Sequence, residues 1–222
     1  MGTLYVVATP IGNLEDITLR ALRILKEVDL IAAEDTRTTR KLTTRFDIGT
    51  PVIAFFQHSG IVSTASIIEK LKAGKNIALV SEAGTPAISD PGTALVAAAV
   101  AAGITVEPIP GPAALAAAAS ISGFPVDRFA FYGFLPVKKG RQKMLAQMLA
   151  EDKTVIFYES PHRIIKTLQQ LADLDGTRFL MIGRELTKKF EEKLRGPVAE
   201  IMAELKKRPA VKGEIVVVMA KK

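Results

Sequence analysis

The sequence contains no cysteine, no tryptophan and only two histidines among its 222 residues. Without cysteine there are no disulfides, thiolate zinc sites, iron–sulfur clusters or cysteine nucleophiles. Two histidines disfavour a histidine-rich metal site, so we expect no metal. Aromatic residues make up 6% of the chain, which disfavours a single-strand binder built on many stacked rings. These shortages predict a protein of a reducing compartment.

Long hydrophobic runs are also missing. The most apolar region, residues 94–119, is interrupted by Gly103, Glu107, Pro108, Pro110, Gly111 and Pro112. A membrane span needs about 20 continuous apolar residues. The first residues carry no basic region ahead of a long apolar stretch, so they do not resemble a signal peptide. We therefore expect a cytoplasmic protein that does not contact membranes.

Two common nucleotide-binding motifs are absent. No G-x-x-x-x-G-K-[ST] occurs, which excludes a P-loop ATPase, and no strand is followed by the dinucleotide fingerprint G-x-G-x-x-G. What the chain does have is an excess of positive charge, with 30 Lys and Arg against 23 Asp and Glu, or +7 with histidine neutral. This excess favours a polyanionic partner.

Short apolar runs alternate with amphipathic segments along the whole chain. We expect strands over residues 4–8, 29–33, 52–56, 77–81, 104–109, 129–132, 154–158, 179–183 and 214–220. We expect helices over 16–28, 63–73, 93–102, 113–119, 139–150, 161–172 and 198–206, and a short helix after Glu34-Asp35-Thr36. Continuously apolar strands separated by helices predict α/β sheets covered on both faces. The length suits two consecutive α/β domains, residues 1–112 and 113–222.

Three expected strand ends are followed by loops rich in glycine and proline. These loops are TPIGN after the first strand, SEAGTPAISDPG after the fourth and PIPGPAAL after the fifth. Ligands of open α/β sheets collect at the carboxyl ends of strands. Any one of these loops is more simply a tight turn, but three at neighbouring strand ends favour a site for a small polar ligand held by main chain.

A series of longer motifs makes the chain resemble a known family. In order they are ATPIGNLEDIT (8–18), AAEDTRTTRKL (32–42), SEAGTPAISDPG (81–92), PIPGPAAL (108–115), FYGFLP (131–136), FYESPHRI (157–164), GRELTKKFEE (183–192), RGPV (195–198) and KGEIVVV (212–218). They are similar to the ribosomal RNA small-subunit methyltransferase I family of the tetrapyrrole methylase superfamily. The similarity covers nearly the whole chain.

This resemblance implies an S-adenosylmethionine-dependent enzyme that 2′-O-methylates a cytidine in the decoding region of 16S rRNA. It also implies a homodimer, with the cofactor in the cleft between the two α/β domains. The implied cofactor residues are Pro10, Ile11, Ser81, Gly84, Thr85, Ile88, Ala113, Ala114, Tyr158, Glu185, Leu186, Gly213 and Glu214. Glu82 and Ala113 depart from the usual Asp and Ser of relatives, so any hydrogen bond at position 113 must come from backbone. Many relatives also continue into a helical C-terminal extension, whereas this chain stops at the expected last strand, so we expect no RNA contact of the kind that the extension makes.

Methyl transfer to a ribose hydroxyl requires alignment and loss of the hydroxyl proton, which invites a general base. We select Glu34, Asp35 and Glu159 as catalytic candidates, ahead of Glu82, Asp90 and His162. For any one of these carboxylates, a helix cap or an arginine partner is the commoner role.

Basic residues and a few aromatic rings are the candidates for RNA contact. We select Arg37, Arg40, Lys139, Arg141 and Arg163, because Lys and Arg bind phosphate without reading sequence. A further basic group contains Lys188, Lys189, Lys193 and Arg195. Phe55, Phe56 and Phe134 are candidates to stack a base, with a core role more typical of the first two.

Two other functions remain open at this point. One is a methylase of a tetrapyrrole such as a cobalamin precursor, against which the basic charge and the motifs AEDTR, YESPHR and GRELTK weigh. The other is a non-catalytic ribosome assembly factor, which the departures at Glu82 and Ala113 keep open.

Overall fold

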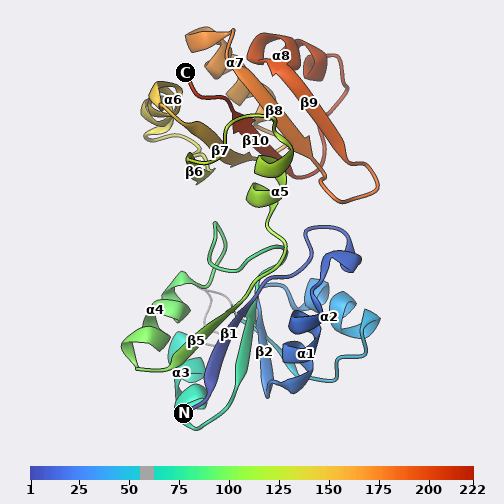
Figure 1. Ribbon diagram of the computed structural model, residues 1–222, viewed down its shortest axis with the longest axis vertical. Helices are drawn as coiled ribbons and strands as arrows, with labels where there is room; N and C mark the ends of the chain where they lie inside the picture. Colours follow the sequence, from blue (N-terminus) through green and yellow to red (C-terminus); the bar gives the residue numbers. More distant parts are fainter. Residues whose placement is uncertain (56–62) are drawn as a thin grey trace. The chain divides into compact units, whose positions relative to one another are not determined.

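Two five-stranded sheets, one in each half of the chain, organise the protein (Figure 1). The computed structural model describes residues 1–55 and 63–222, so Phe56, the last residue of the strand expected over 52–56, lies outside the described residues. The chain forms two units, Met1–Ala113 and Ala114–Lys222. Each combines strands with helices, which confirms the predicted α/β class. No helix within the described ranges is long and apolar enough to cross a membrane.

The sheet of the first unit is entirely parallel. Its strands, in the order β3-β2-β4-β1-β5, are β1 (Thr3–Val7), β2 (Leu30–Ala33), β3 (Val52–Ala54), β4 (Ile77–Val80) and β5 (Thr105–Ile109). Because the strands are parallel, all five carboxyl ends lie at one edge of the sheet. The three glycine- and proline-rich loops therefore leave this same edge.

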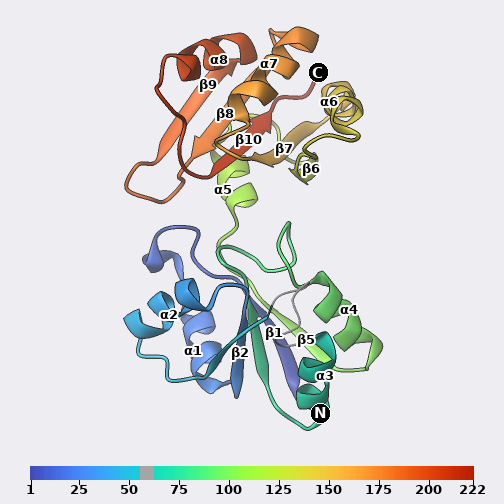
Figure 2. The same cartoon turned by 180° about the vertical axis from the view of Figure 1, so that it is seen from behind.

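Helices cover both faces of the first sheet, as the continuously apolar strands predict (Figure 2). Helices α1 (Leu19–Glu27) and α2 (Thr36–Arg45) share one apolar core with β1, β2 and β4. Helices α3 (Thr64–Lys72) and α4 (Thr93–Ala101) share a second core, which also contains residues of these strands. Because helices cover both faces of the sheet, the strand ends are the places where a ligand can reach it.

The first helix begins three residues later than expected. Residues Leu14–Asp16 form a separate 3₁₀ turn, η1, whose backbone the Asn13 side chain caps. The Thr18 hydroxyl then accepts the N–H of Ala21 and so starts α1 at Leu19. Asp16 thus belongs to η1, and the Thr18 cap separates it from α1, a division that a periodicity argument does not detect.

The second sheet is mixed, with the order β6-β7-β10-β8-β9. Its strands are β6 (Phe129–Phe134), β7 (Thr154–Glu159), β8 (Phe179–Arg184), β9 (Glu192–Pro197) and β10 (Ile215–Met219). Only β6 and β7 pair in parallel, and the other three pairings are antiparallel. Strand β9 is absent from the sequence-based expectation because its sequence, EKLRGP, is mostly polar and contains no continuous apolar run.

The helices of the second unit are α5 (Ala114–Ile121), α6 (Arg141–Ala150), α7 (Ile164–Asp175) and α8 (Val198–Lys206). Helices α6, α7 and α8 pack on one face of the sheet, where Leu145, Leu168 and Ile201 join Phe157 and Val217 in one core. Helix α5 packs against β10 and β7. These contacts hold β7, the strand whose end carries Tyr158 and Glu159.

Candidate functional site

The loops after β1 and β4 are joined to each other at the carboxyl edge of the first sheet. The N–H of Thr9 donates to the Gly84 carbonyl at 2.9 Å, and the N–H of Gly84 donates to the Thr9 carbonyl at 3.0 Å. Gly84 has φ +81°, and a Cβ there would lie 3.5 Å from Cγ2 of Ile11. The residues Pro10, Ile11 and Gly84, selected from sequence, are thus brought together.

The loop after β5 reaches the same place. A Cβ at Gly111 would lie 3.1 Å from the Cβ of Ala8, so glycine lets the backbone of this loop approach the end of β1 closely. The Thr85 hydroxyl donates to the Pro112 carbonyl at 3.2 Å. Ala113 follows directly in this loop. All three glycine- and proline-rich loops of the sequence therefore converge within the first unit.

The loop over residues 81–92 has an unusual but fixed backbone. Ala87 and Ser89 adopt left-handed conformations, with φ of 69° and 62°. Such conformations are costly for residues with a side chain and tend to collect at functional sites. Ser81 is buried and its hydroxyl donates to the Ala83 carbonyl, whereas Ile88 keeps 40% of its surface exposed. Ser81 therefore supports the loop, and Ile88 is available to a ligand.

Two buried hydroxyls have no hydrogen-bond partner in the described part of the chain: Oγ1 of Thr9 and Oγ1 of Thr187. A buried polar group without a partner costs about 1–3 kcal/mol. Thr9 directly precedes Pro10, and Thr187 directly follows Leu186, two residues selected for cofactor contact. Both hydroxyls thus mark places where a bound molecule can supply the missing hydrogen-bond partner.

The acidic residues after β2 have different surroundings. Asp35 caps α2: its Oδ1 accepts the N–H groups of Arg37 and Thr38, and its Oδ2 lies 3.0 Å from Nη2 of Arg37. Hydrogen bonds from the Arg37 side chain and backbone lower the pKa of Asp35 to about 2. Glu34 is half-buried, and its Oε2 accepts the backbone N–H of Glu82 at 3.2 Å. Of the pair, Asp35 is committed to the helix.

In the second unit, the end of β8 and the start of β10 form a cradle around Glu185. The Glu185 N–H donates to the Glu214 carbonyl, and Oε1 of Glu185 accepts the Glu214 N–H, both at 2.9 Å. Gly213 has φ +93°, and a Cβ there would lie 2.4 Å from Cγ of Glu185. Leu186 is buried close to Gly183. The structure therefore brings together Glu185, Leu186, Gly213 and Glu214, as selected from sequence.

The Glu185 carboxylate is held in its charged form. Burial opposes this, but the Glu214 amide and the Lys188 ammonium outweigh it and lower the pKa of Glu185. Nζ of Lys188 lies 3.0 Å from Oε1 of Glu185 and 3.1 Å from Oε2 of Glu214. The cradle is thus polar, charged and prearranged.

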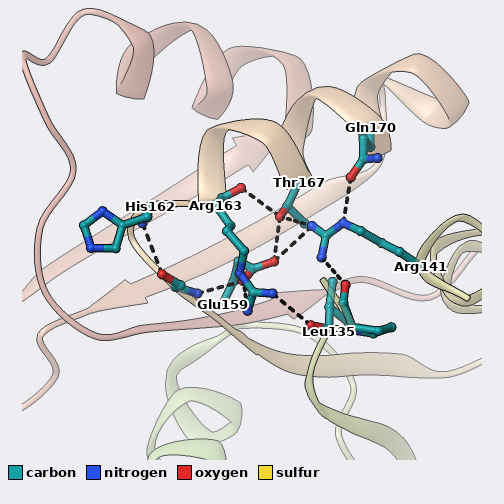
Figure 3. Close-up of polar contacts among 9 residues, drawn as sticks. Leu135, Arg141, Glu159, His162, Arg163, Thr167 and Gln170 are labelled. Carbon is teal, nitrogen blue, oxygen red and sulfur yellow. Dashed lines mark hydrogen bonds and ion pairs between the residues drawn. The ribbon is translucent and has the colours of Figure 1, made fainter. Parts of the chain in front are cut away.

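Glu159 ends β7 and is only 1% exposed. Figure 3 shows its polar contacts. Its Oε2 lies 3.1 Å from Nη2 of Arg141 and 2.7 Å from the Thr167 hydroxyl. Its Oε1 lies 2.7 Å from Nη2 of Arg163 and accepts the Ser160 N–H at 2.8 Å. We call Glu159, Arg141, Arg163 and Thr167 the Glu159 network. All the donors around this carboxylate are internal, so its geometry suits a structural role.

The basic residues selected for RNA differ in exposure. Arg37 and Arg40, on α2, and Lys139, before α6, are exposed. The side chain of Arg163 is 24% exposed and also donates to the Leu135 carbonyl at 3.1 Å. Arg141 is only 5% exposed, with further bonds to the Pro136 carbonyl and to Gln170. Because its guanidinium is engaged inside the unit, we do not carry Arg141 forward as a phosphate contact.

Sequence reasoning missed several features of these sites. The Thr9 hydroxyl lies in the quoted motif TPIGN, yet its burial without a partner is a property of the fold. The partners Thr167 and Gln170 of the Glu159 network lie on α7 and carry no motif signal. Phe55 is 1% exposed and belongs to the core, and Phe56 lies outside the described residues. Within residues 1–55 and 63–222, no three His, Asp or Glu side chains are grouped to hold a metal ion.

Comparisons with known proteins, by family model, by sequence and by structure, all lead to the tetrapyrrole methylases or to ribosomal RNA small subunit methyltransferase I. The family model described as tetrapyrrole (corrin/porphyrin) methylases matches residues 3–202. A Thermotoga maritima protein named ribosomal RNA small subunit methyltransferase I is 45% identical over 222 residues, which cover 100% of both chains. A Synechocystis protein of the same name is 50% identical, over 99% of this chain and 79% of its own length.

A solved structure has the same fold at much lower identity. Uroporphyrin-III C-methyltransferase from Thermus thermophilus, in complex with S-adenosylhomocysteine, superposes with a TM-score of 0.68 at 20% identity. The match covers 98% of this chain and 97% of that chain. At this identity the likeness shows the fold and leaves the substrate undecided.

Proposed function

We propose that this chain, which belongs to the ribosomal RNA small subunit methyltransferase I family of the tetrapyrrole methylases, 2′-O-methylates the ribose of a cytidine in the decoding region of 16S rRNA. The observation that carries the proposal is the 45% identity to a relative of this name over 100% of both chains. The structural match to a tetrapyrrole methylase, at 20% identity, is far weaker support for the alternative substrate. The exposed basic residues are consistent with a polyanionic substrate.

The residues present fit S-adenosylmethionine as cofactor. When bound, it supplies a methyl group activated by its sulfonium. The two orphaned hydroxyls, Thr9 and Thr187, offer hydrogen bonds that the protein itself leaves unused. The glycine-rich loops offer main-chain groups, and the cradle around Glu185 offers charge. A solved relative of the same fold contains S-adenosylhomocysteine, which supports this choice.

We assign cofactor contacts to residues of each unit. In the first unit they are Pro10, Ile11, Ser81, Gly84, Thr85, Ile88 and Ala113. In the second they are Ala114, Tyr158, Glu185, Leu186, Gly213 and Glu214. The rigid loops and strand ends that carry these residues orient the ligand, and alignment of this kind supplies roughly 7–11 kcal/mol of the barrier reduction in favourable cases.

Of the three carboxylates selected as catalytic, we propose Glu34 as the general base that accepts the proton of the ribose hydroxyl. Its side chain is half-buried at the carboxyl edge of the first sheet and receives one backbone N–H. Asp35 is a weak base, with a pKa of about 2, because it caps α2 and pairs with Arg37. Glu159 is enclosed by the Glu159 network. Glu34 is thus the carboxylate with accepting capacity to spare.

We assign the RNA phosphates to Arg37, Arg40, Lys139 and the exposed part of Arg163. These side chains set affinity and salt dependence rather than sequence preference. We also propose that the protein acts as a homodimer in rRNA processing in the cytoplasm. Sedimentation of the purified protein tests the dimer.

A methyl-transfer assay tests the function directly. The protein is incubated with S-adenosylmethionine labelled in its methyl group and, separately, with small ribosomal subunits, free 16S rRNA and a cobalamin-precursor tetrapyrrole. We expect label in the ribose of a cytidine of the decoding region. Label in the tetrapyrrole alone would support the alternative methylase, and tight ribosome binding without transfer would support an assembly factor.

A further inference from the structure

An aromatic ring stands exposed at the end of β6. Phe134, the last residue of this strand, is 57% exposed. The pairing of β6 with β7 is irregular between Phe131 and Phe134, and Gly133 there has φ +58°. A bulge of this kind re-aims the side chain that follows it. The strand thus turns one large apolar ring toward solvent at the carboxyl end of the parallel pair.

The exposed ring has firm support. Its centroid lies 5.4 Å from that of Tyr158, and Tyr158 lies 5.2 Å from Phe131 in an edge-to-face arrangement. We call these three rings the aromatic platform. The backbone that follows is also held, because Arg163 donates to the Leu135 carbonyl at 3.1 Å and Arg141 donates to the Pro136 carbonyl at 3.0 Å (Figure 3).

Both arginines are anchored on the buried carboxylate of Glu159. The Glu159 network therefore fixes the backbone of Leu135 and Pro136, which directly follow Phe134. A ring held in this way loses little conformational freedom when it binds a partner. This gives the Glu159 network a positioning role, in agreement with its enclosure.

Positive charge follows Phe134 in the sequence, at Lys138, Lys139 and Lys143, and all three side chains are exposed. His162 is also exposed, and its imidazole points away from the Glu159 network (Figure 3). From residue 129 to residue 150 the sequence contains no Asp or Glu. In the part of the chain that the structure describes, none of the three lysines has an ion-pair partner. Their charge is therefore available to an external anion.

We propose that the exposed ring of Phe134, supported by Tyr158 within the aromatic platform, stacks a nucleobase of the RNA substrate while Lys138, Lys139 and Lys143 contact neighbouring phosphates. The inference rests on the proposed function, since an RNA substrate provides both bases and phosphates. Aromatic rings combined with cations are the usual means of holding unpaired nucleotides. A second copy of the chain fits less well, because a symmetric contact through this surface places like charges opposite each other.

Kinetics of the Phe134→Ala variant test the stacking. We expect the KM for small ribosomal subunits to rise roughly 5- to 150-fold, the range for loss of one stacked base, with the affinity for S-adenosylhomocysteine unchanged. Phe179→Ala is the matched control, because Phe179 is 53% exposed in the same unit but lies outside the platform. Phe134→Trp restores the KM, since it keeps a ring, and Phe134→Leu does not.

A spectroscopic arm is independent of turnover. The chain contains no tryptophan, so Phe134→Trp introduces a single reporter. A cytidine-containing oligoribonucleotide quenches this fluorophore if a base stacks on it, whereas Phe179→Trp stays unquenched. Quenching requires no methyl transfer, so this arm decides the inference even where the wild-type protein transfers no label and the proposed function fails.

Five results overturn the inference. These are an unchanged KM in Phe134→Ala, full recovery of the KM by Phe134→Leu, an equal loss of S-adenosylhomocysteine affinity in Phe134→Ala, a change in the oligomeric state of that variant, and no quenching of Phe134→Trp by the oligoribonucleotide. The second indicates an apolar contact without stacking, the third a cofactor contact, and the fourth an interface between copies. Transfer by the wild-type protein together with any of them leaves the proposed function standing.

Discussion

Three carboxylates of similar promise in the sequence have three different surroundings. Asp35 caps a helix and pairs with Arg37, Glu159 lies buried between two arginines, and Glu34 keeps accepting capacity. Sequence motifs mark all three, but only burial and partners separate a base from a structural anion. At the residue scale, the role of an acidic side chain depends on how many donors already surround it.

Replacement of Glu159 by alanine tests its structural role. Removal of this carboxylate leaves Arg141 buried without its counter-charge, and breaking a buried pair in this way costs about 3–5 kcal/mol. Urea denaturation measures the free energy of unfolding. Glu27→Ala is the control, because it removes an exposed partner of Arg23 and costs about 1 kcal/mol or less. Equal losses in the two variants would contradict the structural role.

Replacement of Glu34 by glutamine tests the proton acceptor. We expect kcat to fall by about 10²–10⁴, the usual contribution of a general base, while S-adenosylhomocysteine binds with wild-type affinity. Asp35→Asn is the neighbouring control, since asparagine also caps helices well and kcat is expected to persist. If Asp35→Asn loses activity and Glu34→Gln retains it, the assignment of the base is wrong.

The loops that form the candidate site were predictable from the sequence, whereas the roles of individual side chains were less so. The convergence of the loops after β1, β4 and β5 follows from parallel strands and from the glycine and proline that each loop contains. The burial of Arg141 was not predictable, because its partners Glu159, Thr167 and Gln170 come from β7 and α7. Long-range ion pairs leave no local pattern in a sequence.

At the scale of elements, strand β9 shows why a mostly polar strand escapes detection. It lies at the edge of the sheet and alternates exposed charge with Leu194, which packs against the core. Glu192 of this strand joins Arg184 of β8 to Arg208 after α8, at 2.8 and 2.7 Å. Ion pairs to neighbouring elements thus hold a strand that apolar content alone does not reveal. The strands with continuous apolar runs were all predictable within one or two residues.

The tight approach of β10 to the end of β8 gives a prediction for glycine. In Gly213→Ala the new Cβ meets Cγ of Glu185, which the Glu214 amide and Lys188 hold in place. We expect a roughly tenfold loss of S-adenosylhomocysteine affinity, measured by calorimetry, because the Glu185 cradle is displaced. Gly74→Ala is the control: φ is +90° there, and no atom lies within 4 Å of the added Cβ.

Both alanine variants carry the backbone penalty of a left-handed residue, about 1–2 kcal/mol of stability. Only Gly213→Ala is expected to affect ligand affinity. If Gly74→Ala weakens binding to the same extent, the effect comes from general destabilisation and not from the cradle.

At the scale of the whole molecule, the excess charge of +7 predicts that the affinity for RNA falls as the salt concentration rises. The slope of log K against log salt reports the number of phosphates neutralised, at about 0.7 per contact for single strands. We expect Arg40→Ala and Lys139→Ala each to lower the magnitude of this slope by about 0.7, measured by retention of the RNA complex on a filter. Arg23→Ala, which removes a cation paired with Glu27, leaves the slope unchanged. Equal slopes in all variants would place the RNA elsewhere.

The position of β10 means that the second sheet is complete only once the last strand of the unit is in place. In sequence β10 is the last strand, yet in space it lies between β7 and β8. Until it inserts, the sheet consists of two separate ribbons, β6–β7 and β8–β9, whose inner edges present unpaired N–H and C=O groups. Open edges of this kind promote pairing between chains. A nascent second unit is therefore most exposed to aggregation just before β10 inserts, whereas the first sheet is complete by Ile109.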